Sequence, residues 1–188
     1  ATFTPGANTV ELEGTATQTI SAVGGETFSS LTVNTSPQVT LNNPISVSSA
    51  LTMTAGIIQS SSSNLVRLLD NATSTIGSAS SYIDGPMQFD MAQNGAPSTT
   101  LNFPIGKNGS YGGASLIIRH SAGTSFSYTA EVIASSASAL GFTLAGTTDK
   151  VSNVRYWNIQ RGLTISPGTT NNSNITTSGG QGPRLPLC

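Results

Sequence analysis

The sequence predicts an all-β protein in which short β-solenoid (β-helix-like) repeats are followed by a β-sandwich-like segment. The triplet Leu31-Thr32-Val33 recurs as Leu51-Thr52-Met53 at an offset of 20 residues, and two similar triplets, 39–41 and 45–47, lie between them. Periods of roughly 20 to 50 residues are typical of repeat proteins, whose units bury their apolar faces only against one another. Only 8% of the residues are charged, and the scarcity of Lys and Glu, the usual residues of helix surfaces, favours strands.

The first half is expected to consist of short strands separated by turns that contain glycine. Alternation of polar and apolar residues marks the strands, and clusters of Ser, Asn and Gly mark the turns. In chain order we expect strands at 9–12 and 18–22, a turn at Gly24-Gly25, the repeat strands up to Thr54 and a turn at Gly56. A loop at 60–64 and a strand at 65–69, with Arg67 and Asp70 facing solvent, follow, and the repeat ends after 73–76.

In the second half the sequence repeat is lost and the strands become longer. Residues 116–119, 126–132 and 154–159 are each predicted to form a strand, because they combine β-branched and aromatic residues. A proline cannot donate to a central ladder, so strand edges or turns are expected at Pro86, Pro97 and Pro104. The predicted organisation is repeats over 1–80, a sandwich-like segment over 81–162 and a polar tail rich in Gly, Asn and Thr over 163–188.

Charge, hydropathy and cysteine content argue against several classes of protein. The net charge is −1 without a basic cluster, whereas nucleic-acid binding requires several Lys or Arg on one face. No stretch approaches the ~20 apolar residues of a membrane span, and an exported form is expected to have lost its signal peptide. The single cysteine, Cys188, excludes an internal disulfide. Its role stays open between pairing with another chain and a remnant of truncation or cloning.

Histidine is a common catalytic and metal-binding residue, and this chain has one, His120. A lone imidazole cannot assemble a zinc site of three protein ligands unless carboxylates supply the rest. We therefore interpret His120 as structural and expect no metal site and no cofactor.

Two pairs of carboxylates are the remaining candidates for catalysis, Glu11 with Glu13 and Asp84 with Asp90. Residues two apart on a strand share a face, which would bring Glu11 and Glu13 towards the separation of a glycosidase pair. Charges on an edge strand more often discourage edge pairing, and this is the interpretation we favour. Asp84 is expected to cap the turn at Gly85-Pro86, with calcium ligation as the alternative. We expect no catalytic residue and not an enzyme.

Aromatic side chains that stack on sugar rings would support carbohydrate binding, and the candidates are Tyr111, Tyr128, Tyr156 and Trp157. Adjacent residues on a strand face opposite sides, so Trp157 is expected to point into the core and Tyr156 outward. N-glycosylation sequons occur at Asn34, Asn71, Asn108, Asn171 and Asn174. A chain this rich in Asn and Thr is expected to contain such sequons by chance.

Seven short blocks follow one another in a specific order along residues 10–161. They are QTI at 18–20, FSSLTVN at 28–34, VTL at 39–41, LTMTAGII at 51–58, YIDGPM at 82–87, FPIGK at 103–107 and YWNI at 156–159. In this order they resemble the repeat regions, and the segments after them, of large secreted surface proteins of Bacteroidota-type bacteria. The resemblance implies export by the type IX route and a place in an adhesin-like or filamentous protein, without catalytic residues. It is lost after Arg161.

Together these observations predict a structural or adhesive element outside a bacterial cell, a fibre-forming subunit that joins copies of itself through strand edges and ends. A stack of repeats leaves open strand edges, which invite pairing with another chain. Two alternatives remain open. A carbohydrate-binding module, with surface glycans as partners, requires an exposed aromatic platform, and a β-helix polysaccharide-degrading enzyme requires two carboxylates that converge in a groove.

Overall fold

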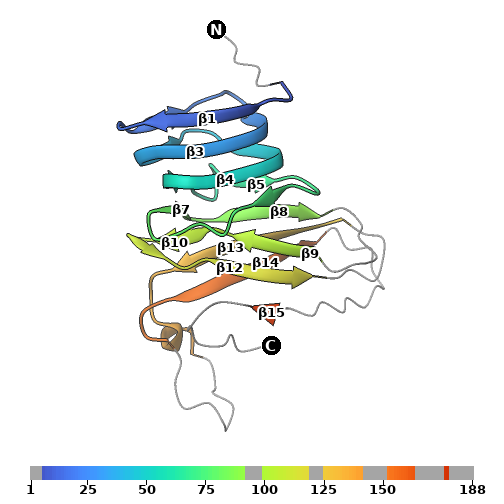
Figure 1. The fold of residues 1–188 in the computed structure, drawn as a ribbon. Coiled ribbons are helices and arrows are strands. Elements are labelled where there is room, and N and C mark those ends of the chain that lie inside the picture. The colour runs from blue at the N-terminus through green and yellow to red at the C-terminus, as the bar shows by residue number, and fades with distance from the viewer. Residues whose placement is uncertain (1–5, 92–98, 119–124, 142–151, 164–175, 178–188) are drawn as a thin grey trace.

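The computed structural model describes residues 6–91, 99–118, 125–141, 152–163 and 176–177, and it is all-β. A coil of stacked parallel strands passes into a curled antiparallel sheet (Figure 1). The elements are β1 Thr9–Gly14, β2 Gln18–Ile20, β3 Glu26–Leu41, β4 Ile45–Gln59, β5 Val66–Leu68, β6 Thr73–Ser74, β7 Ser81–Asp84, β8 Met87–Met91, β9 Thr99–Phe103, β10 Ile105–Lys107, β11 Ser110–Tyr111, β12 Ala114–Ile118, β13 Phe126–Ile133, the 3-10 turn η1 Ala137–Leu140, β14 Tyr156–Leu163 and β15 Thr176–Thr177.

The sequence offset between the two repeated triplets corresponds to one turn of the coil. Leu31 of β3 pairs in parallel with Leu51 of β4, and Val33 pairs with Met53, so the repeated triplets lie side by side. Leu31 is also paired, on its other side, with Val10 of β1. Leu31 and Leu51 are buried. The repeat thus stacks equivalent apolar residues in the core, and the predicted β-solenoid is confirmed.

Successive turns of the coil build three ladders of hydrogen-bonded strands around a common apolar core. The first ladder consists of β1, the middles of β3 and β4, and β6. The second ladder consists of β2, the C-terminal parts of β3 and β4, β7, β10 and β11. The third ladder consists of the N-terminal parts of β3 and β4, then β5, β8, β13 and β14.

The third ladder changes from parallel to antiparallel where β13 pairs with β8. A separate antiparallel sheet of β9, β12 and β15 lies across the core from it. Phe89 of β8 meets Phe103 of β9 edge to face, with ring centroids 4.9 Å apart. Two sheets that bury aromatic residues between them make this part sandwich-like, as predicted. The ladders continue across the predicted boundary at position 80, because Met87 of β8 pairs with Val66 of β5.

Two expectations for the repeats differ from the structure. The four short triplets are joined in pairs within the long bent strands β3 and β4, whose mutual register shifts at three places. These irregularities allow one continuous strand to bend around the coil. Gly56 was expected to close a turn, but it lies inside β4 with φ of +92°. It forms a corner of the coil, where its N–H donates to the Ser80 carbonyl oxygen of the next turn (2.9 Å).

Most other predicted elements are present. Gly24 and Gly25 have positive φ, and Gly25 N–H donates to the Ala22 carbonyl oxygen (2.8 Å), as expected of a turn. The predicted strands at 9–12, 18–22, 65–69, 116–119, 126–132 and 154–159 correspond to β1, β2, β5, β12, β13 and β14, with small differences in their bounds. The short strand β6 lies at 73–76, where the repeat was expected to end. Strands β7 to β11 and β15 were not predicted. Pro97 and most of the tail at 163–188 lie outside the described residues.

The corner at Gly56 yields a stability prediction. Gly56→Ala is expected to lower the free energy of unfolding by about 3 kcal/mol, because a Cβ there would overlap the Thr35 carbonyl oxygen while φ remains positive. Gly109→Ala is the matched control, since φ is +77° and no atom lies within 4 Å of the added Cβ. It should cost only about 1–2 kcal/mol. Urea unfolding compares the two, and equal losses would show that the Thr35 contact is unimportant.

Candidate functional site

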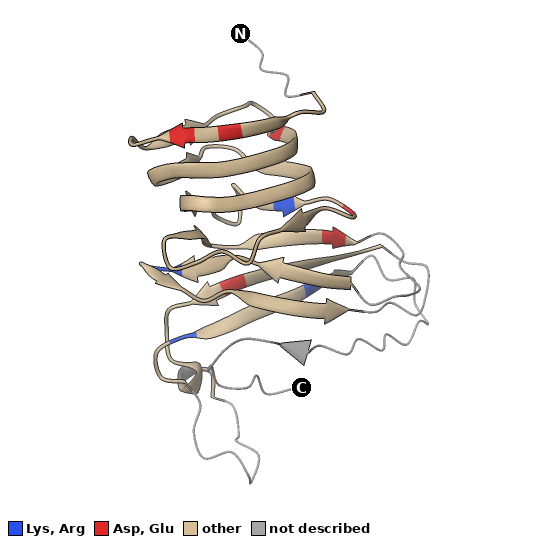
Figure 2. Cartoon of the chain, viewed as in Figure 1, with Lys and Arg blue, Asp and Glu red and all other residues tan. Residues whose placement is uncertain are grey.

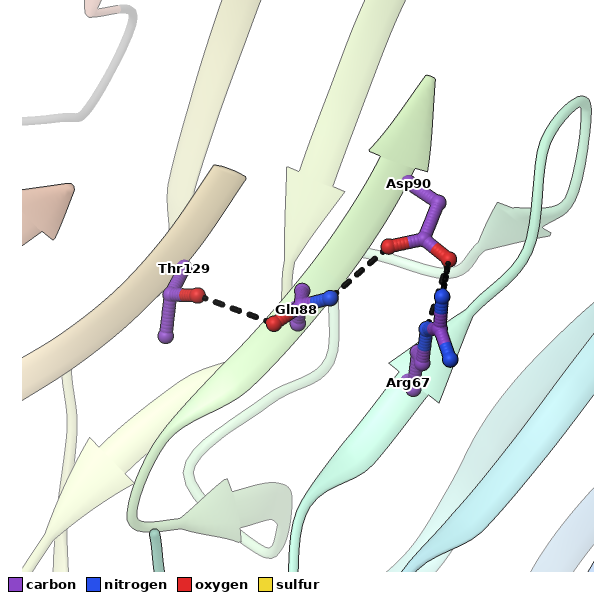
Figure 3. Close-up of polar contacts among 4 residues, drawn as sticks. All are labelled: Arg67, Gln88, Asp90 and Thr129. Carbon is purple, nitrogen blue, oxygen red and sulfur yellow. Dashed lines mark hydrogen bonds and ion pairs between the residues drawn. The ribbon is translucent and has the colours of Figure 1, made fainter. Parts of the chain in front are cut away.

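A chain of polar side chains crosses the third ladder at its change of strand direction (Figure 3). Arg67 of β5 donates from Nε to Asp90 Oδ2 (2.6 Å), and its Nη2 lies 2.5 Å from the same oxygen. Gln88 donates from Nε2 to Asp90 Oδ1 (2.7 Å) and accepts from the Thr129 hydroxyl (3.3 Å). The network ties β5, β8 and β13 together and occupies both oxygens of Asp90.

The other predicted acid of this pair, Asp84, lies on β7 in the second ladder. Its Oδ1 is 3.7 Å from Lys107 Nζ, which is also 3.6 Å from Glu131 Oε1 on β13. Its Oδ2 accepts from the backbone N–H of Asn108 (3.1 Å), so it caps the turn after β10 instead of the turn at 85–86. Asp84 and Asp90 therefore have different cationic partners on different ladders.

Glu11 and Glu13 share the outward face of β1, as the alternation predicted. Their inward neighbours, Val10 and Leu12, pack against the core but are only partly buried. Asn34 Nδ2 donates to Glu11 Oε1 (3.3 Å). Among the described strands β1 is hydrogen-bonded only to β3, so the two carboxylates lie on an edge strand.

The aromatic candidates for sugar binding mostly make internal contacts. Tyr128 is buried. Trp157 packs against the core, as predicted, and its Nε1 donates to the Gly112 carbonyl oxygen (2.6 Å). The Tyr111 hydroxyl donates to the Ile76 carbonyl oxygen (2.6 Å). Of the four candidates, only Tyr156 is neither buried in the core nor engaged in one of these hydrogen bonds, and its side chain is partly buried.

Several candidates from the sequence fall outside the described residues. These are His120, Cys188, Asn171 and Asn174. Of the other sequon residues, Asn34 lies on β3, whereas Asn71 and Asn108 adopt φ of +66° and +50° in turns. Asn tolerates this conformation better than most residues, which explains both turn positions without invoking a glycan.

A small cavity of about 120 Å³ lies beside the turn after β5 and the adjoining ends of β8 and β9. Two carboxylates line it, Asp70 and Asp90, but Asp90 is bonded as described and Asp70 accepts from Asn71 Nδ2 (2.7 Å). Within the described ranges, no group of three or more His, Cys, Asp or Glu is placed to hold a metal ion. In the same ranges, no helix has the length and hydrophobicity needed to cross a membrane.

The sequence did not single out four residues that take part in these contacts, Gln88, Thr129, Lys107 and Glu131, nor the buried Tyr82. The register that pairs Val66 with Met87 also pairs Arg67 with Gln88, so extending the repeat period beyond β5 would have placed these two side by side. Lys107 had no comparable signal, because it belongs to a strand that was not predicted. Tyr82 is fully buried, and its hydroxyl has no partner at hydrogen-bonding geometry among the described residues.

Comparison with known proteins adds no information on function. No family model matches the chain, and neither a curated protein nor a solved structure matches it. Any function must therefore be argued from the sequence and the geometry above.

The Arg67–Asp90 contact predicts a modest effect on stability. Asp90→Ala is expected to cost about 1 kcal/mol, because Arg67 and Gln88 lose an acceptor, but the Arg67 side chain is 49% exposed and water screens the ion pair. Arg67→Ala and the double variant complete a mutant cycle read by urea unfolding. A coupling free energy well above ~1 kcal/mol would mean that the pair is less screened than its exposure indicates.

The buried hydroxyl of Tyr82 predicts a pH effect. Burial, and secondly the Asp84 carboxylate, raise the pKa of Tyr82 above 10.0, and nearby Gly109 N–H offsets this only in part. Since the folded state favours the neutral phenol, the stability that this group contributes is complete below pH 10 and is lost as the pH rises through the folded-state pKa. Tyr82→Phe should therefore unfold less readily than the wild type at alkaline pH.

At pH 7, Tyr82→Phe should change the free energy of unfolding by less than about 0.5 kcal/mol, because no hydrogen bond is lost. Tyr111→Phe is the contrasting variant. Burial raises the pKa of Tyr111 as well, but loss of its bond to Ile76 should cost about 1 kcal/mol at pH 7. Urea midpoints measured across the alkaline range test this prediction. If Tyr82→Phe and the wild type lose the same stability as the pH rises, ionisation of Tyr82 does not contribute to alkaline unfolding.

Proposed function

We propose that this chain is a structural or adhesive element of a bacterial extracellular surface protein, and that copies of it join through strand edges and ends into fibres. The observation that carries this proposal is the third ladder, in which β3, β4, β5, β8, β13 and β14 form one continuous run of hydrogen-bonded strands. A pull between the ends of such a ladder is transmitted from strand to strand through the backbone hydrogen bonds of each successive pair.

The outward surface supports the same proposal. Outward positions on the coil carry mainly hydroxyl and amide groups, such as Thr32 and Thr52, which pair with each other on neighbouring turns. Together with a charge content of 8%, this gives a surface suited to many weak hydrogen-bonded contacts rather than to one charged ligand. The sequence resemblance to secreted surface proteins supports an extracellular location and export by the type IX route.

Open strand edges supply the means of assembly. In the described part of the chain, β1 has a hydrogen-bonded neighbour on one side only, and so has β14. An exposed edge presents unpaired N–H and C=O groups that another strand can satisfy. The carbohydrate-binding and enzymatic alternatives have no comparable support, since Tyr128 and Trp157 pack inward and Asp84 and Asp90 are paired separately.

The proposal predicts that purified chain 1–188 assembles as its concentration rises. Negative-stain electron microscopy should show regular filaments with an axial repeat near one subunit length, and light scattering should show a concentration-dependent increase in mass. Cys188→Ser in the presence of reductant is the control, and it should assemble equally if strand edges and not a disulfide join the copies. Uniform single particles at every concentration would contradict the proposal.

A further inference from the structure

Charged residues are distributed unequally between the two ends of the strand stack. Acidic side chains occupy its first turn, with Glu11 and Glu13 on β1 and Glu26 at the start of β3 (Figure 2). Arg155 and Arg161 lie at the opposite end, immediately before and within β14. The cations between the ends have carboxylate partners inside the stack. One end of the described stack is therefore acidic and the other is basic.

Both ends also leave apolar side chains incompletely covered within the described residues. On the acidic end Val10, Leu12 and Ile20 are only partly buried. The residues that pair with them one turn further in, Leu31, Val33 and Leu41, are 0%, 0% and 4% exposed. On the basic end Trp157 and Ile159 are likewise partly buried against the core. Covering these side chains would be favourable at either end.

The charges distinguish between the possible contacts. If two copies met through their β1 edges, Glu11 and Glu13 of one copy would face the same carboxylates of the other, and like charges opposite each other destabilise paired strands. A contact that seats β14 on the start of β3 brings Glu26 of β3 towards Arg155 and Arg161, while Glu11 and Glu13 on β1 add negative charge to the same end from the neighbouring ladder. Of the possible contacts between ends, the one that joins the acidic end of one copy to the basic end of the next (a head-to-tail contact) therefore has complementary charge.

The strand direction at the basic end is compatible with this contact. β8 runs parallel to the strands of the coil, β13 runs antiparallel to β8, and β14 runs antiparallel to β13. β14 consequently has the same direction as the N-terminal part of β3, which begins the third ladder in the first turn. It can extend that ladder into a neighbouring copy as one more parallel strand.

From charge, apolar exposure and strand direction, we infer that the partner of the β1 end is the β14 end of a second copy of this chain. This inference rests on the proposed fibre function and adds a polarity to it. A contact between two different surfaces leaves each free on the outer subunits, so assembly continues as an open filament instead of closing as a dimer.

The test reverses the charges at each end. One variant is Glu11→Lys/Glu13→Lys/Glu26→Lys, and the other is Arg155→Glu/Arg161→Glu. Alone, each has like charges at both ends, so its apparent association constant should fall about tenfold, with filaments lost at the wild-type critical concentration. In an equimolar mixture every contact is again complementary, so filaments of alternating copies should return. Light scattering and electron microscopy measure both results, and raising the salt concentration should weaken wild-type assembly.

Controls separate charge at the ends from net charge and from misfolding. Glu11→Gln/Glu13→Gln and Ser49→Lys/Thr54→Lys each change the net charge by +2, but the second pair lies on exposed positions of β4 in the middle of the stack. Only Glu11→Gln/Glu13→Gln should weaken assembly. Arg161 stacks on the Phe126 ring, with its guanidinium 5.4 Å from the centroid. Arg155 donates from Nη1 to the Tyr111 carbonyl oxygen (3.4 Å). Arg155→Glu alone, which keeps the stacking on Phe126, serves as a milder variant, and thermal unfolding verifies that every variant is folded.

The outcomes distinguish this inference from the function on which it rests. A wild-type protein that remains single at all concentrations overturns both. Wild-type filaments that are indifferent to charge reversal, or folded variants whose mixture fails to assemble, overturn the head-to-tail contact and leave the fibre proposal intact. Loss of assembly in each variant with recovery in the mixture supports both.

Discussion

The structure depends on the register in which apolar side chains of successive coil turns meet inside the stack. Leu31 lies between Val10 and Leu51, and Val66 lies between Ile45 and Met87, so that each is one turn of the coil from its two neighbours. Because side chains alternate along a strand, a slip by one residue would turn every one of these groups outward. The corner at Gly56, where a Cβ would overlap the neighbouring turn, opposes such a slip.

The same register explains the sparse charge of the chain. Parallel stacking brings each outward residue beside its equivalent on the next turn, about 4.8 Å away. A repeated Lys or Glu would thus form a column of like charges, which destabilises paired strands. Thr, Ser and Asn stack without this repulsion. Where charges occur inside the stack they join different strands, as in Arg67 with Asp90, and Lys107 with Asp84 and Glu131.

The sequence predicts the fold in the segment where the apolar triplets recur. Prediction fails further along the chain, where the spacing between coil turns persists but the triplets do not. An inward position requires apolar volume and not a particular residue, so Met87 continues the column of Ile45 and Val66 without resembling them. Alternation likewise placed Glu11 with Glu13 and turned Trp157 inward. It could not relate Asp84 to Asp90, because the turn at 85–86 carries the chain from the second ladder to the third.

Directionality links this architecture to its proposed role. A coil of parallel strands has two inequivalent ends, because its first turn presents the start of β3 and its last presents an antiparallel addition, β13 with β14. A two-fold contact would have to join like ends, and the carboxylates on β1 oppose this at one of them. Joining unlike ends preserves the direction of the third ladder from copy to copy. The continuous run of hydrogen-bonded strands that stabilises one subunit can then continue from each copy into the next.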